Sequence, residues 1–164
     1  MSILNITSKE DLSTFTMIIQ GSINESFLQK SVQIPPGKKI IINFNSVSSI
    51  NSLGIRHWIQ WIRAYPNSKY VFQGCPQCVV DQMNSVIDFI PTNCVVESFF
   101  VPYYCEENGE EKQVLYKLNE DYFPNKPVTP KEIKDSTGNK MELDASPQKY
   151  FKFLSQKKAS QGGA

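Results

Sequence analysis

Residues 45–62, NSVSSINSLGIRHWIQWI, decide which fold we expect for this chain. Small polar residues fill the first half of the stretch, and an apolar pattern follows Gly54. Four apolar residues recur there at a spacing that places them on one face of a helix. They are Ile55, Trp58, Ile59 and Ile62. Asn51 or Ser52 suits the helix start, because their side chains accept hydrogen bonds from free backbone N–H groups.

Strand and helix patterns alternate on both sides of this helix. Apolar and β-branched residues predict strands at 14–23, 40–44, 69–74 and 94–101. A second helix is predicted from about Val79 to Ile90. Its inner side would carry Val79, Val80, Met83, Val86, Ile87 and Ile90. This order predicts an α/β fold in which helices pack on a sheet.

The character of the chain changes near residue 100. A short hairpin is predicted around Asn108 and Gly109, followed by a proline-rich connection. Residues 156–164 have the composition of a disordered tail. We therefore expect a first domain at 1–100, a small C-terminal β-rich appendage at 101–155, and a tail at 156–164.

Charge and composition exclude several classes of protein. Seventeen basic residues balance sixteen acidic residues, which argues against a nucleic-acid binder. No apolar run approaches the roughly 20 residues of a membrane-spanning helix. The N-terminus lacks the basic and apolar regions of a secretory signal. We expect a cytoplasmic protein without membrane contact, whose four cysteines are thiols rather than disulfides.

The stretch INFNSVSSINSLGI, residues 42–55, resembles the STAS domain of bacterial anti-sigma-factor antagonists. The resemblance covers about residues 8–100, including QGSINE at 20–25. It implies a mixed β-sheet flanked by helices and a non-catalytic role in bacterial signalling and transcription regulation. The implied partner is an anti-sigma factor with a serine-kinase fold, or another component of a signalling complex.

The resemblance also implies a site at the helix entrance. Ser52 occupies the position that an anti-sigma kinase phosphorylates in the family, although Asn51 replaces the family's aspartate. The implied docking surface comprises Asn51, Ser52, Leu53 and Gly54, with Arg56, His57 and Gln60 as the next exposed positions. The alternative for Ser52 is that it only caps the helix.

Cys75 and Cys78 form a CxxC motif that supports a rival hypothesis. Such a pair can hold a metal or cycle as a redox dithiol. A zinc site needs four ligands, and no second CxxC is present. The motif therefore leaves two interpretations. The cysteines are plain turn residues, or the protein is a redox-responsive or metal-responsive one that uses them.

The appendage resembles a zinc ribbon that has lost its metal. Cys105 and Asn108 stand where the first cysteine pair of a ribbon would be, before Gly109. Lys134 and Thr137 stand where the second pair would be. An unrelated β-rich extension is the alternative.

Nothing in the sequence predicts an enzyme or a cofactor. His57 is the single histidine, and no nucleophile, phosphate-loop or metalloprotease motif is present. The third hypothesis for function is a structural subunit of a permanent complex.

Overall fold

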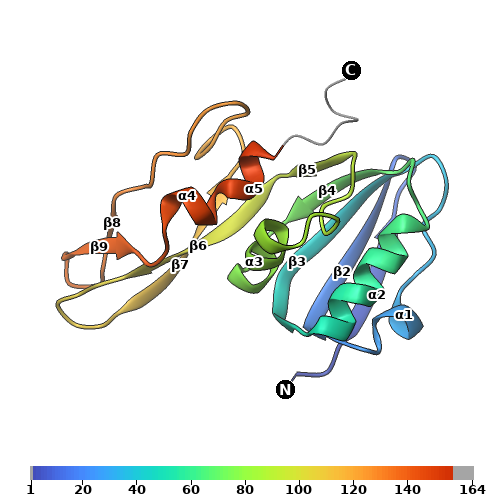
Figure 1. The fold of residues 1–164 in the computed structure, drawn as a ribbon, viewed down its shortest axis with the longest axis horizontal. Helices are drawn as coiled ribbons and strands as arrows, with labels where there is room; N and C mark the ends of the chain where they lie inside the picture. The colour runs from blue at the N-terminus through green and yellow to red at the C-terminus, as the bar shows by residue number, and fades with distance from the viewer. Residues whose placement is uncertain (1, 157–164) are drawn as a thin grey trace.

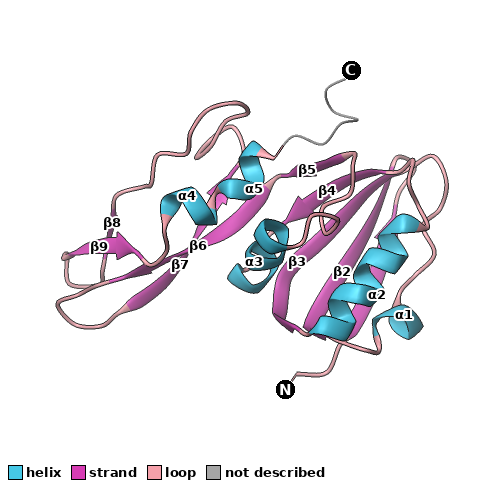
Figure 2. Cartoon of the chain, viewed as in Figure 1, coloured by secondary structure: helices cyan, strands magenta, loops and turns pink. Residues whose placement is uncertain are grey.

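The computed structural model describes residues 2–156, so the predicted tail lies outside the described residues except for Gln156. Nine strands and five helices follow one another along this part of the chain (Figure 2). In chain order they are β1 (Asn5–Glu10), β2 (Thr14–Ile23), α1 (Phe27–Lys30), β3 (Lys39–Ile50), α2 (Ser52–Arg63), β4 (Lys69–Gln73), α3 (Gln77–Ser85), β5 (Cys94–Val96), β6 (Ser98–Tyr104), β7 (Glu111–Lys117), β8 (Ile133–Lys134), β9 (Lys140–Leu143), α4 (Pro147–Tyr150) and α5 (Lys152–Ser155).

The first sheet has the order β1-β2-β3-β4-β5. β1 is antiparallel to β2, and the other neighbours are parallel. Helices α2 and α3 lie across one face of this sheet (Figure 1). Residues 14–19 of β2 alternate between half-buried and buried because alternate side chains of a strand point to opposite faces. The predicted α/β class is confirmed.

Trp58 of α2 is the centre of the core between helices and sheet. The centroid of its ring lies 5.5 Å from that of Phe44 and 5.9 Å from that of Phe72. It stacks on the Phe89 ring with a centroid distance of 5.3 Å. Its indole N–H donates to the Phe89 carbonyl at 2.9 Å. Aromatic pairs of this kind add about 0.5–1.5 kcal/mol each beyond their buried area.

The predicted strands lie where the sequence placed them, but their lengths and number differ. β3 continues to Ile50, because hydroxyl groups make its polar end compatible with a sheet: Ser49 Oγ lies 2.7 Å from Ser22 Oγ of β2. β1 was not predicted. The predicted strand 94–101 is two strands, since the chain leaves the first sheet at Glu97 and enters the second at Ser98.

The second predicted helix ends earlier than expected. α3 stops at Ser85, and Val86 is extended with φ −116° and ψ 108°. This turn brings Phe89 beneath Trp58 and leaves Ile87 80% exposed, so the prediction that Ile87 faces inward was wrong.

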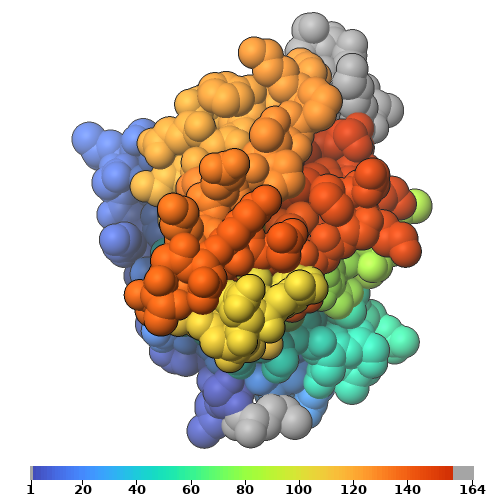
Figure 3. Space-filling model, turned by 90° about the vertical axis from the view of Figure 1, so that its left-hand side faces the viewer, coloured from blue at the N-terminus to red at the C-terminus, as the bar shows by residue number. Residues whose placement is uncertain are grey.

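The second sheet has the order β7-β6-β9-β8. The predicted hairpin is confirmed, with β6 antiparallel to β7. Cys75 connects the two sheets: its N–H donates to the Ser98 carbonyl at 3.2 Å, and its carbonyl accepts from Phe100 N–H at 2.8 Å. One buried core runs through both parts. In Figure 3 the yellow-to-red segments cover the middle of one face, and green and teal segments remain uncovered at the lower right.

Asn84 of α3 holds the C-terminal helices in place. Its side chain donates to the Tyr150 carbonyl at 2.9 Å and accepts from the Phe153 N–H at 2.8 Å. Within residues 2–156, no helix has the length and apolar character needed to cross a membrane.

Candidate functional site

The entrance of α2 is built by a side-chain cap. Asn51 is extended, with φ −99° and ψ 173°, and its Oδ1 accepts from the Gly54 N–H at 2.8 Å. The helix begins at Ser52, as the sequence predicted. The cap is Asn51 and not Ser52, so the alternative role of Ser52 as the helix cap was wrong.

Gly54 fixes the helix against the sheet. A Cβ atom at this position would lie 2.2 Å from the Ile23 carbonyl oxygen at the end of β2. The Asn51 N–H donates to the same carbonyl at 3.1 Å. Gly54 is buried, so its side of the helix cannot meet a partner, and its predicted place on the docking surface was wrong.

The other predicted residues lie together on the outer side of α2. Asn51, Ser52, Leu53, Arg56 and Gln60 are exposed. Leu53 is 42% exposed, a large apolar side chain in the first turn of the helix. His57 is half-buried, and its Nδ1 is buried without a hydrogen-bond partner among the described residues.

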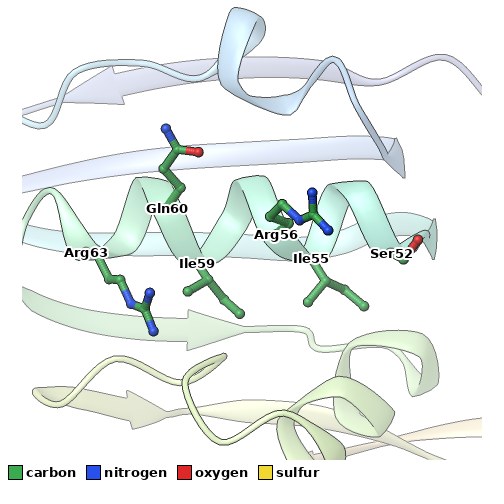
Figure 4. Close-up of a pocket in the computed structure, with 6 residues that line it drawn as sticks. All are labelled: Ser52, Ile55, Arg56, Ile59, Gln60 and Arg63. Atoms are coloured by element: carbon green, nitrogen blue, oxygen red, sulfur yellow. The ribbon is translucent and has the colours of Figure 1, made fainter.

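A shallow groove of about 550 Å³ runs along α2 from this entrance (Figure 4). Its lining residues are Ser52, Ile55, Arg56, Ile59, Gln60 and Arg63. Ile55 and Ile59 were predicted to share one face of the helix with Trp58 and Ile62. Both are only half-buried, and they point to the same side of α2 as Arg63. Ile55, Ile59 and Arg63 were not predicted as site residues. Their spacing of four residues from one to the next was the signal in the sequence that could have identified them.

The charges around the entrance have both signs. Asn51 Nδ2 donates to Glu25 Oε2 at 3.3 Å. The pKa of Glu25 is lowered first by a hydrogen bond from its own backbone N–H to the carboxylate and then by the bond from Asn51. Arg56 follows Ser52 by four residues, the spacing at which helical side chains meet. Arg63 Nη2 forms a salt bridge with Asp88 Oδ2 at 2.8 Å. The first turn of α2 carries no acidic residue, so its N–H groups and Arg56 favour an anion at Ser52.

The CxxC cysteines lie in a different place. Cys75 is fully buried at the seam between the sheets, and burial raises the pKa of its thiol well above the usual range. Burial also raises the pKa of Cys78, which lines a cleft of about 510 Å³ beside Asp81 and Phe100. Reactive thiols have a lowered pKa. This geometry therefore favours structural cysteines over redox-active ones.

The cysteines also lack partners for a metal. Among residues 2–156, no three His, Cys, Asp or Glu side chains are grouped so that they could hold an ion. In the appendage, Lys134 is exposed on β8, and Asp135 rather than Lys134 or Thr137 faces Cys105 and Asn108. Lys134 and Thr137 were predicted to stand where the second cysteine pair of a ribbon would be. The residue that faces the first loop is Asp135, so this prediction was wrong.

Comparisons with known proteins add no family to these observations. No protein-family model matches the chain, and no curated protein matches it either.

Proposed function

We propose that this chain is a STAS-like, cytoplasmic protein-binding module of bacterial signalling, which acts as an anti-sigma-factor antagonist does and performs no catalysis. The proposal is supported by the parallel order of β2, β3 and β4 and by the helix that begins directly after β3. The observation that carries it is the exposed first turn of α2, where Ser52 lines one end of a groove and Leu53 beside it is an exposed apolar side chain.

The groove suits a protein partner. Ile55 and Ile59 offer an apolar floor, while Arg56 and Gln60 offer polar contacts at its edge. Interfaces commonly combine an apolar centre with a polar rim. The partner in this proposal is an anti-sigma factor with a serine-kinase fold, or another component of a signalling assembly.

Phosphorylation of Ser52 would switch this surface. A phosphate adds nearly two negative charges at about neutral pH and three acceptor oxygens. At Ser52 it would meet the N–H groups of the first turn and Arg56, and together with Glu25 it would make the entrance of α2 predominantly acidic. A partner that packs on Leu53 would then be released.

The test is affinity capture from native cell extract with four baits: wild type, Ser52→Asp, Ser52→Ala and Ser8→Asp. Ser8 is an exposed serine on β1, away from α2, and so is a matched charge control. We expect one specific protein partner to be lost with Ser52→Asp alone. An identical partner list for all four baits would remove Ser52 from the mechanism.

The same experiment separates the other hypotheses. A structural subunit would keep its partner in every bait and on dilution. A redox protein would change its partners with oxidant, through Cys75 and Cys78, and not with substitution of Ser52.

A further inference from the structure

Two tight loops face each other in the second sheet. In the loop between β6 and β7, Gly109 N–H donates to the Cys105 carbonyl at 2.8 Å. In the loop between β8 and β9, Gly138 N–H donates to the Asp135 carbonyl at 3.3 Å. Gly109 and Gly138 have φ of +74° and +90°, a region that glycine adopts most readily. Paired loops of this kind hold the metal in a zinc ribbon.

The donor set between these loops does not fit zinc. A structural zinc site takes four ligands, usually thiolates and imidazoles. Cys105 is the one thiol between the loops, and Asn108 offers an amide. Two carboxylates also lie between the loops. Glu110 of the first loop accepts from Ser136 N–H at 2.9 Å and from Ser136 Oγ at 2.7 Å. Asp135 of the second loop is already saturated by hydrogen bonds.

Asp135 is 6% exposed and accepts bonds at both oxygens. Its Oδ1 accepts from Thr137 N–H at 2.9 Å, Thr137 Oγ1 at 3.0 Å and Asn139 N–H at 2.8 Å. Its Oδ2 accepts from Asn108 Nδ2 at 2.7 Å and Asn139 Nδ2 at 3.2 Å. A carboxylate offers about four lone-pair sites, so these five donors, to which the Cys105 thiol adds a sixth, leave none for a metal.

The carboxylate remains charged in this surrounding. Burial acts to raise the pKa of Asp135, but the Asn139 N–H, the Cys105 thiol and the Thr137 N–H and hydroxyl together outweigh burial and hold the pKa well below its usual range. Hydrogen bonds to an ionised acceptor are about twice as strong as bonds between neutral groups.

We propose that the Asp135 carboxylate takes the place of a metal ion in this module and is the buried anchor of the two loops, while the exposed bonds from Ser136 to Glu110 join them at the surface. The charges are inverted relative to a zinc ribbon: a central anion is surrounded by N–H, O–H and S–H donors, where a ribbon has a central cation among thiolates. Asn108 and Cys105 reach it from the first loop, and Thr137 and Asn139 from the second. The appendage therefore folds without metal.

The test compares amide hydrogen exchange of residues 105–110 and 133–143 in the full chain, in EDTA and with added zinc chloride. The variants are Asp135→Asn and, as a matched control, Asp144→Asn at an exposed aspartate close by. We expect wild type and Asp144→Asn to be equally protected in both solutions. We expect Asp135→Asn to accelerate exchange about tenfold or more in both segments, including residues 105–110, which it touches only through its carboxylate.

Two results would overturn the proposal: loss of protection of wild type in EDTA, with stoichiometric zinc restoring it, or unchanged exchange of residues 105–110 in Asp135→Asn.

If Asp135→Asn does not fold, Asn108→Asp serves in its place. This isosteric change turns a donor toward Asp135 into a second carboxylate, and we expect faster exchange of residues 135–139. Unchanged exchange there would likewise contradict the anchor.

Discussion

Gly54 of α2 lies against Ile23 of β2 so closely that a Cβ atom would be 2.2 Å from the carbonyl oxygen and 2.6 Å from the carbonyl carbon. The groups in the way are backbone, which cannot rotate aside. The contact holds the first turn of α2 at the end of β2 and turns Ser52 and Leu53 outward. The position of the candidate site depends on this contact.

We predict that Gly54→Ala destabilises the protein, although alanine is the better helix former by about 1 kcal/mol. Forcing an atom into this contact costs about 1–3 kcal/mol or more, since α2 must move away from the sheet. Urea unfolding followed by tryptophan fluorescence measures the change. Gln60→Ala, at an exposed position of the same helix, should alter the free energy of unfolding by less than about 0.5 kcal/mol. A Gly54→Ala variant as stable as wild type would show that α2 is not held there.

Loss of the Asn51 cap should also weaken α2. Asn51→Ala removes the acceptor for the Gly54 N–H and should cost about 1 kcal/mol in the free energy of unfolding. Asn51→Ser keeps an acceptor oxygen at the cap and should lose little, because serine is among the preferred N-cap residues. Equal losses in the two variants would assign the effect to Glu25, which Asn51 contacts through its amide nitrogen.

Asn84 should control how firmly the C-terminal helices are attached. Asn84→Ala leaves the Tyr150 carbonyl and the Phe153 N–H without their side-chain partner, at a cost of about 1–3 kcal/mol. We expect faster proteolysis after residue 146 and a lower unfolding midpoint. Ser85→Ala, at the exposed end of α3, is the control. Proteolysis at the wild-type rate in Asn84→Ala would mean that ring contacts alone hold these helices.

Stability should fall in alkali. Burial raises the pKa of Tyr70 to about 12, and burial also raises the pKa of Tyr103, Tyr122 and Tyr150. An unfolded tyrosine ionises near about pH 10. The folded state binds these protons more tightly, so their contribution to stability is complete below about pH 10 and is lost as the pH rises toward 12. The tyrosinate absorbance of these four residues, obtained as the difference between wild type and each Tyr→Phe variant, should rise together with unfolding. Their ionisation near about pH 10 in a folded protein would contradict this.

The sequence predicted elements where local pattern decides the outcome. Asn51 as one of two candidate caps, the strand 14–23 and the turn at Asn108 and Gly109 were all predicted from neighbouring residues alone. The end of α3 was not, because it depends on Phe89 stacking under Trp58, a contact across 31 positions in the chain.

The candidate site was predicted only in part, because some of its features depend on contacts between residues far apart in the chain. Helical spacing predicted that Ile55 and Ile59 lie on one apolar face, but spacing cannot show that the neighbouring elements leave a groove beside them. Asp135 was missed because its role appears only when two loops far apart in the chain meet.

Site-specific photo-crosslinking in the native cell tests the proposed docking surface most directly. A photoreactive amino acid is placed at Leu53, in the exposed first turn of α2, and as a control at Val95, an exposed apolar residue on β5. We predict a single discrete adduct with another protein from position 53, absent from position 95 and lost when Ser52→Asp is added. No adduct at position 53, or the same adducts from both positions, would contradict the account.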